Sequence, residues 1–313
     1  MQIIDFTNCI LSERAGTYGG NAGFKDGIIY EGENWIIKYP KTTKGMRVDD
    51  ISYTTSPLSE YIGSHVYDIL GYDVHETLLG YRNEKIVVAC KDFCRYEGEL
   101  REIRTIKNLA NPQLAEMLDR SFSSTDTGEQ IDLDEILLHL KYNDILSQVA
   151  GITERFWDCV VIDILINNND RNNGNWGVLR RDGSFILAPV FDNGAAFSTK
   201  ASDEKLEKSL GNEERFLFDA TNTVTRFSKN EEILTAKKML SLEEEGLKIA
   251  IEKNVPVMER CFGEIEAMIM DIPSEAYGLY VCSDIRKEAY LKGMHARFDR
   301  LIAPMCRSMK GGK

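Results

Sequence analysis

Two short stretches of the chain carry most of its functional information: Asn167–Gly177, which reads NNNDRNNGNWG, and Val190–Gly194, which reads VFDNG. Asp170 in the first stretch is followed five positions later by Asn175, and Asp192 in the second stretch stands two positions ahead of a glycine. Sequences so rich in asparagine and glycine predict loops. Loops held on a rigid scaffold are where catalytic groups concentrate, so we expect a functional site here.

These residue types suit phosphoryl transfer from a nucleotide. One carboxylate accepts the proton of the attacking hydroxyl, and an amide oxygen and a second carboxylate hold magnesium. The spacing matches the kinase pattern Asp-x-x-x-x-Asn followed by Asp-x-Gly. We therefore expect Asp170 to be the catalytic aspartate, Asn175 and Asp192 to bind Mg²⁺, and ATP to be the phosphate donor. The alternative is that both stretches are turns without a catalytic role.

A second Asp-x-x-x-x-Asn match, Asp163 with Asn168, overlaps the first. Asp163 lies within Val160–Ile166, an apolar run that predicts a buried helix or strand. Asp170 follows in a polar loop, which makes it the better candidate for the catalytic group.

The segment between the two stretches predicts a β-hairpin. Arg181–Gly183 contains an Asp-Gly pair between two short apolar runs, and such a pair favours the tight turn that joins antiparallel strands. A hairpin returns the chain toward its starting point. We therefore expect Asp192 to lie beside Asn175.

The N-terminal third contains two further features that kinases need. Gly16–Gly23 is rich in glycine, and glycine lets the backbone approach nucleotide phosphates closely, although such segments are more often simply flexible. Lys38 interrupts an apolar run on a predicted strand, where kinases keep the lysine that contacts the phosphates. The alternative for Lys38 is a surface lysine at a sheet edge.

A helix is predicted for Ser56–Gly71, with Pro57 in its first turn and a glycine at its end. Glu60 is the only glutamate of this helix, and we expect it to pair with Lys38. The alternative is that Glu60 only complements the positive end of the helix dipole. Two predicted strands follow and lead into Cys90–Cys94, which in a two-lobed kinase is the connection that meets the adenine ring.

The chain resembles the HipA-like kinases, including the shorter cell-translocating type. The resemblance rests on the motifs TYGGN (17–21), IIK (36–38), SEYIG (59–63), NDRNNGNWG (169–177) and FDNG (191–194). It implies an α+β, two-lobed protein-kinase-like fold, akin to that of the phosphatidylinositol 3/4-kinases. A small β-rich N-lobe is expected over residues 1–95 and a larger helical C-lobe over residues 96–313.

The same resemblance implies roles for individual residues. Asp170, Lys38 and Glu60 would form the catalytic set, and Asn175 and Asp192 would be the magnesium ligands. The residues expected to bind ATP are Gly16, Thr17, Tyr18, Gly19, Gly20, Asn21, Lys38, Asp92 and Phe93. The expected reaction transfers the γ-phosphate to a protein hydroxyl, with serine or threonine favoured and autophosphorylation included. A toxin of a toxin–antitoxin pair is one expected setting.

Two residues depart from the family pattern. Asn172 stands where relatives often have histidine, and Asn193 replaces the Phe of the usual Asp-Phe-Gly; neither change removes a proposed metal ligand or base. Longer relatives carry an additional N-terminal subdomain, and here we expect either a separate small partner protein in its place or a kinase that works without it. Two other readings stay open: a non-catalytic nucleotide- or partner-binding pseudokinase, and a small-molecule phosphotransferase.

Composition sets outer limits. The chain has 313 residues, 43% of them hydrophobic, which is enough for a large core. Its formal net charge of −12 disfavours nucleic acid and anionic membranes as partners. Seven cysteines without a Cys-x-x-Cys pair predict reduced thiols in a cytoplasmic protein, and the four histidines show no metal-binding spacing. No signal peptide or membrane-spanning apolar stretch is visible, although export without a recognisable signal stays open.

The C-terminal half has helical periodicity. Helices are predicted at 132–148, 154–167, 231–253, 257–270 and 283–309. Pro256 is expected to separate the third from the fourth, because proline disrupts a helix interior.

Overall fold

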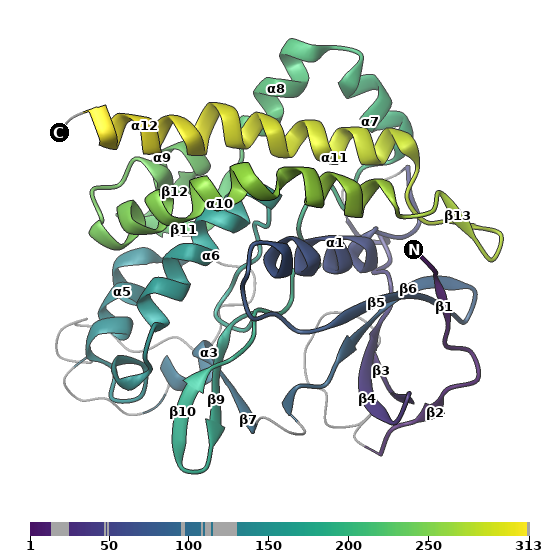
Figure 1. Ribbon diagram of the computed structural model, residues 1–313, viewed down its shortest axis with the longest axis horizontal. Helices are drawn as coiled ribbons and strands as arrows, with labels where there is room; N and C mark the ends of the chain where they lie inside the picture. Colours follow the sequence, from purple (N-terminus) through teal and green to yellow (C-terminus); the bar gives the residue numbers. More distant parts are fainter. Residues whose placement is uncertain are drawn as a thin grey trace. The chain divides into compact units, whose positions relative to one another are not determined.

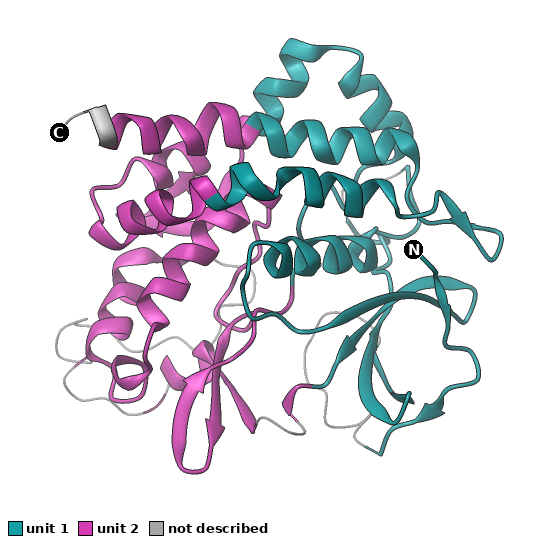
Figure 2. Cartoon of the chain, in the orientation of Figure 1, with its two compact units in different colours: residues 1–92, 193–220, 257–296 teal, residues 93–192, 221–256, 297–313 magenta. Residues whose placement is uncertain are grey.

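The computed structural model describes residues 1–13, 25–46, 48, 50–94, 98–107, 109, 114 and 130–311. The chain forms two compact units (Figure 2). Unit 1 comprises residues 1–92, 193–220 and 257–296, and unit 2 comprises residues 93–192, 221–256 and 297–313. Both units combine helices with strands (Figure 1), so the expected α+β class is confirmed. The expected lobe boundary between residues 95 and 96 stays a prediction.

Unit 1 is built on a six-stranded sheet with the strand order β1-β5-β6-β4-β3-β2. Neighbouring strands are antiparallel, except that β1 runs parallel to β5. Its strands are β1 (Ile4–Asp5), β2 (Ile10–Leu11), β3 (Lys25–Tyr30), β4 (Glu33–Lys38), β5 (Thr77–Arg82) and β6 (Lys85–Lys91). An apolar cluster around Phe6, Trp35 and Ile37 packs against the sheet. Gly80 permits the close approach of β1, because a Cβ atom there would lie 2.2 Å from the Phe6 ring.

Helix α1 (Ser56–Ile69) packs against β5 and β6. Pro57 stands in its first turn, where a missing N–H costs no hydrogen bond, and Gly71 follows its end with φ of 85°. The predicted start and end of this helix are therefore confirmed. Burial of apolar side chains such as Ile62 fixes the face that α1 turns inward, and Glu60 lies on that buried face with 1% exposure.

The remainder of unit 1 is mostly helical and carries one small hairpin. Its elements are α7 (Asp203–Leu210), α8 (Glu213–Thr221), the C-terminal part of α10 (Glu245–Met270), β13 (Glu275–Ala276), β14 (Leu279–Tyr280) and α11 (Asp284–Arg297). The buried Arg286 of α11 binds Asp203 at 2.6 Å, and Phe197 stacks on Tyr290 with ring centroids 4.7 Å apart. These contacts hold the chain that follows Asn193 against the helices.

Unit 2 is arranged around α6 (Ile152–Ile166), which is buried over most of its length. Its strands are β7 (Glu99–Glu102), β8 (Ile131–Asp132), β9 (Gly177–Arg181), β10 (Ser184–Leu187), β11 (Val224–Lys229) and β12 (Glu232–Thr235). Its other helical elements are α3 (Ile103–Lys107), α5 (Leu133–Tyr142), η2 (Leu146–Gln148), α9 (Ala236–Leu240), the first part of α10, η3 (Phe298–Ile302) and α12 (Ala303–Gly311). The strands form two sheets, β10-β9-β7 and β12-β11-β8.

The predicted hairpin is confirmed as β9 and β10. Its two-residue turn is Asp182-Gly183, with φ of 48° and 81°, which is the paired positive φ that an Asp-Gly turn between twisted strands requires. The hairpin leads the chain back to its own start, since Ala188 N–H donates to the carbonyl of Gly177 at 3.3 Å.

Two of the helix predictions are wrong. Residues 232–235 form strand β12 instead of a helix, because Asn230 and Glu231 adopt positive φ and turn the chain back onto β11. Pro256 does not separate two helices and lies inside α10. Two residues before it, Asn254 donates to Asp158 of α6 and to the carbonyl of Ala250, both at 2.8 Å. We attribute the continuous helix to this buried anchoring, which offsets the hydrogen bond that proline cannot donate.

Candidate nucleotide-binding and catalytic site

The expected site residues are distributed over both units. In unit 1, the structure brings Lys38 and Glu60 together as an ion pair, with 2.9 Å between Nζ and Oε2. Lys38 is the last residue of β4 and Glu60 lies in the second turn of α1. The Lys38 side chain is 20% exposed and that of Glu60 is 1% exposed. The cation therefore reaches the surface while its partner is buried, as expected for a lysine that also contacts an anionic ligand.

Among the described residues, Glu60 has three polar partners. In addition to Lys38, its Oε1 accepts the backbone N–H of Asn193 at 3.1 Å and lies 3.0 Å from His75 Nε2. Burial by itself would raise the pKa of the Glu60 carboxyl, but the Lys38 cation and the hydrogen bond from His75 outweigh burial and hold that pKa well below its usual range. Glu60 is therefore an anion that stabilises the charged form of Lys38.

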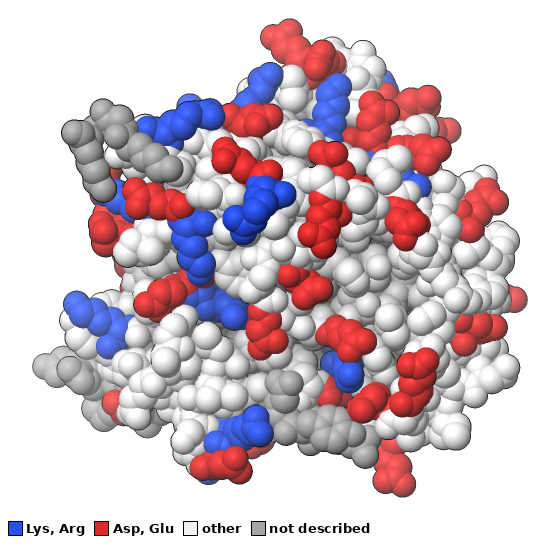
Figure 3. Space-filling model, in the orientation of Figure 1, with Lys and Arg blue, Asp and Glu red and all other residues white. Residues whose placement is uncertain are grey.

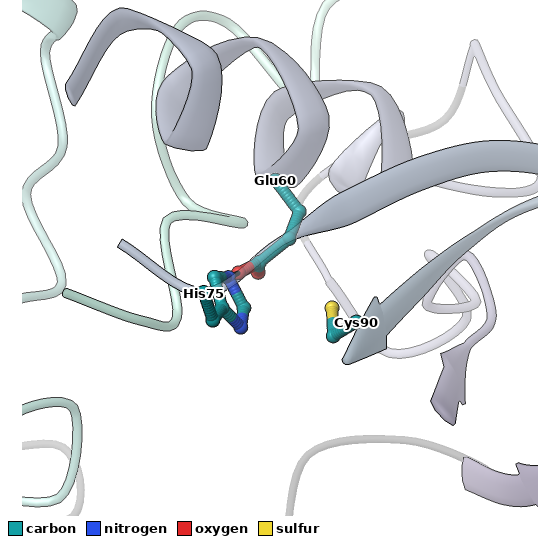
Figure 4. Close-up of side chains that lie close together, drawn as sticks. All are labelled: Glu60, His75 and Cys90. Atoms are coloured by element: carbon teal, nitrogen blue, oxygen red, sulfur yellow. Dashed lines mark ion pairs between the residues drawn. The ribbon is translucent and has the colours of Figure 1, made fainter. Parts of the chain in front are cut away.

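Sequence reasoning did not find His75. Figure 4 shows its ring directed at the Glu60 carboxylate, with Cys90 of β6 nearby. One potential ligand atom from each of these three residues lies within 4.8 Å of the others, which is close enough to consider a metal ion. The hydrogen bonds of Glu60 already use its oxygens, so we interpret the trio as a hydrogen-bonded group. No spacing rule signals such a contact, since His75 and Glu60 lie on different elements.

In unit 2, the loop that contains Asp170 begins where α6 ends. Asn167 ends the helix in the left-handed conformation with φ of 55°, a role that asparagine tolerates well. The Asp170 side chain, which is 40% exposed, follows in the loop. The Asn175 side chain donates its N–H to the Asp170 carbonyl at 2.6 Å. This bond uses the amide nitrogen, and the amide oxygen is the atom of the group that could bind magnesium.

Arg171 ties this loop together and was not predicted to have a role. It is 4% exposed, and its Nε and Nη2 bind the two carboxylate oxygens of Asp163 at 2.8 and 2.9 Å. Its Nη1 donates to the carbonyls of Asn175 at 3.0 Å and of Phe191 at 2.6 Å. Asp163, set aside above as a buried residue, is thus confirmed as buried and serves as the counter-ion of Arg171.

One guanidinium therefore connects both proposed magnesium-ligand segments. Arg171 binds the backbone of Asn175 itself and the carbonyl that directly precedes Asp192. Asp192 has φ of 61°, an unfavourable conformation for a residue with a side chain, which is held only where surrounding contacts fix it. The structure thus places the Asn175 and Phe191 carbonyls on a shared anchor. That the Asp192 side chain lies beside Asn175 stays a prediction.

The remaining expected residues are Asp92, Phe93 and the glycine-rich segment. The Asp92 backbone N–H donates to the Asn34 carbonyl at 2.9 Å. The Phe93 ring lies 5.9 Å from that of Phe191, measured between centroids. The segment from Gly16 to Asn21 lies outside the described residues.

A small pocket lies beside the Asp170 loop within unit 2. Its lining includes Asn167, Asn168, Thr223 and Arg226. Arg226 Nη1 lies 3.8 Å from Asp170 Oδ1, so a cation stands next to the proposed catalytic carboxylate.

Comparison with protein families assigns the chain to a class. Residues 22–261 match the model of the HipA-like C-terminal domain, and the chain belongs to this family. The expected kinase-like α+β fold is confirmed by two solved structures. The crystal structure of a proinflammatory kinase CtkA from Helicobacter pylori matches with a TM-score of 0.83 at 27% identity, covering 98% of each chain.

The second solved structure is a complex of HipA, HipB and operator DNA from Shewanella oneidensis. It matches with a TM-score of 0.50 at 10% identity over 98% of this chain and 75% of that chain, which supports the fold alone. Among curated proteins, the serine/threonine-protein kinase CtkA of Helicobacter pylori strain J99 is 36% identical over 214 residues. That match covers 68% of this chain and spans 61% of the length of the relative.

Proposed function

We propose that the chain is an ATP-dependent serine/threonine protein kinase that also phosphorylates itself. The observation that carries this proposal is the Lys38–Glu60 pair, since a buried, ionised glutamate that holds a partly exposed lysine from the neighbouring strand is the arrangement that kinases use to bind ATP phosphates. The relative CtkA, named a serine/threonine-protein kinase, supports the acceptor type.

Each residue then has a defined task. Asp170 orients the acceptor hydroxyl and accepts its proton, and Asn175 and Asp192 bind Mg²⁺, which neutralises the phosphate charge. Lys38 binds the phosphates and Glu60 positions Lys38. The glycine-rich segment from Gly16 to Asn21 covers the phosphates, and the Asp92–Phe93 connection contacts adenine. The partly exposed Asp170 can meet a hydroxyl carried by a protein.

We propose a protein as substrate and a small protein as regulatory partner, in a cytoplasmic setting of the toxin–antitoxin type. The HipA structure contains HipB and therefore supplies a model for such a partner. Direct nucleic-acid binding is disfavoured, because the net charge is −12 and the face in Figure 3 carries many acidic side chains. Across the described part of the chain, every helix is too short or too polar to traverse a bilayer.

Incubation of the purified chain with ATP and Mg²⁺, followed by intact-mass and peptide analysis, tests the proposal. Phosphate on a serine or threonine of the chain, or of an added protein, is the expected result. Phosphate found only on an added small molecule would assign the activity to that class of acceptor. A rise in Tm with Mg-ATP but no phosphate on any acceptor would identify a nucleotide-binding module.

Replacing Lys38 by alanine should lower the rate by about 10²-fold, because it removes charge stabilisation of the transferring phosphate in a partly dry site. Single-turnover kinetics at saturating ATP would measure this loss. Lys248 of α10 offers a control, since it also pairs with a glutamate, Glu243, but does so at the surface. A Lys248→Ala variant should keep its rate; an equal loss in both variants would argue against a specific role for Lys38.

Replacing Asp192 by alanine should raise the Mg²⁺ concentration for half-maximal activity by about 10-fold or more, because a direct ligand should cost at least as much as an outer-shell partner. Alanine keeps a Cβ atom, so the φ of 61° at position 192 is unfavourable in the variant as it is in the wild type. A magnesium titration at fixed ATP measures the effect. An unchanged midpoint with a lower maximal rate would show that Asp192 is not a magnesium ligand.

A further inference from the structure

Four buried side chains of unit 1 form a closed ring of hydrogen bonds beside Lys38. His75 Nε2 lies 3.0 Å from Glu60 Oε1 and 3.2 Å from Ser64 Oγ. Asn193 closes the ring, because its side-chain Nδ2 donates to Ser64 Oγ and its backbone N–H donates to Glu60 Oε1, both at 3.1 Å. All four residues are at most 5% exposed.

The carboxylate determines which nitrogen of the histidine can donate. Glu60 is ionised and can only accept hydrogen bonds. A proton on His75 Nε2 faces both Glu60 Oε1 at 3.0 Å and Ser64 Oγ at 3.2 Å, so the two oxygens share this one donor. Because His75 and the Asn193 N–H both occupy Oε1, the other carboxylate oxygen is left for Lys38. The ring thus determines which oxygen of Glu60 faces the lysine.

The ring also reaches the segment of the proposed magnesium ligand. Asn193 follows Asp192 directly, and it is the residue that replaces Phe in the kinase Asp-Phe-Gly pattern. Gly194 lies close as well, since a Cβ atom there would stand 3.0 Å from Glu60 Oε2. Glycine therefore lets this segment approach Glu60, and two hydrogen bonds from Asn193 hold it there. A phenylalanine at position 193 could not supply the side-chain donor.

We infer that Asn193, Ser64 and His75 are positioning residues that hold Glu60 toward Lys38 and, through the same hydrogen bonds, fix the backbone that presents Asp192. The inference rests on the proposed roles of Lys38 and Asp192. Buried polar rings of this kind are effective only when every member is satisfied, so loss of one donor should loosen the others.

The chain offers a matched pair of variants for the test. Ser59 and Ser64 lie on the same helix and are both buried, at 0% and 1% exposure. Ser64 belongs to the ring, whereas the Ser59 Oγ has no hydrogen-bond partner within the described part of the molecule. Ser64→Ala should raise the Mg²⁺ concentration for half-maximal activity by about 10-fold, the usual cost of an outer-shell partner. Ser59→Ala should leave it unchanged.

A double-variant cycle tests the ring as a unit. Asn193→Ala removes the bond to Ser64, and Ser64→Ala removes that bond together with the His75 contact. Asn193→Ala should therefore cost no more than Ser64→Ala, and the double variant should be no worse than Ser64→Ala. His75→Gln keeps a donor and should retain more magnesium affinity than His75→Leu. A nitrogen NMR spectrum should show His75 protonated at Nε2 independently of activity.

The outcomes separate the inference from the proposed function. Two results with an active wild-type protein would overturn the ring. In one, Ser64→Ala behaves like Ser59→Ala; in the other, the effects of the Asn193 and Ser64 substitutions add. If the wild-type protein binds zinc and the His75→Gln and Cys90→Ser variants do not, Glu60, His75 and Cys90 form a metal site and not part of a hydrogen-bonded ring. A wild-type protein that neither transfers phosphate nor gains Tm with Mg-ATP contradicts the proposed function itself.

Discussion

Replacing Asp170 by alanine should lower the rate of phosphoryl transfer by about 10³-fold, within the range expected for loss of a general base. Asp170 is proposed to orient the acceptor hydroxyl, and its carboxylate makes no contact that the Lys38 pair needs. Nucleotide affinity should therefore change little. Asp170→Asn should be nearly as inactive, because an amide cannot accept the proton while it fills the same space.

Single-turnover rates and Mg-ATP affinity, measured on the same preparations, would show this separation. Asp182 provides the control, since its side chain is 96% exposed at the turn of the β9–β10 hairpin. An Asp182→Asn variant keeps a residue that favours this turn and should keep full activity. Retention of activity in Asp170→Asn would show that the catalytic aspartate lies elsewhere.

Local sequence signals predicted much of this molecule. Turn chemistry identified the hairpin at Asp182, and helix start and stop signals placed α1. Glu60 lies in the second turn of this helix, among its buried residues, and there it meets Lys38 of the sheet. These features depend on neighbours in sequence, for which propensity and periodicity are informative.

The unpredicted features depend on contacts between distant residues. Arg171 binds Asp163 eight positions away and Phe191 twenty positions away, and Asn193 reaches Ser64 on another element. Pro256 lies inside α10, where we attribute the unbroken helix to the hydrogen bond from Asn254 to Asp158 of α6. This contact outweighs the tendency of proline to end a helix. Side-chain hydrogen bonds have no periodicity in sequence, so motif spacing identified the residues that meet the substrate and missed those that hold them.

Replacing Asp163 by alanine should destabilise the protein by about 3–5 kcal/mol, because it leaves the Arg171 guanidinium buried without its counter-ion. Arg171 is 4% exposed and its bonds to Asp163 use both carboxylate oxygens. Asp163→Asn should cost less, since the amide oxygen can still accept one of the two bonds. Denaturant unfolding of the wild type and both variants would measure these differences.

Activity measurements alone do not distinguish Asp163 from Asp170 as the catalytic aspartate. Loss of activity in Asp163→Asn cannot by itself make Asp163 the catalytic group, because Arg171 also holds the Asn175 and Phe191 carbonyls. The double variant Asp163→Leu with Arg171→Met resolves the question. An apolar pair of similar volume can restore stability where a buried ion pair is replaced, yet methionine offers no donor to either carbonyl.

We therefore expect the double variant to recover most of the unfolding free energy that Asp163→Ala loses while its phosphoryl transfer stays impaired. The impairment should appear as a raised half-maximal Mg²⁺ concentration, because Asn175 and Asp192 lose their shared anchor. Recovery of both stability and magnesium affinity would show that the Arg171 bonds contribute only to folding. Full transfer activity in Asp163→Ala, at a temperature where it is folded, would show that the catalytic loop keeps its geometry without the pair.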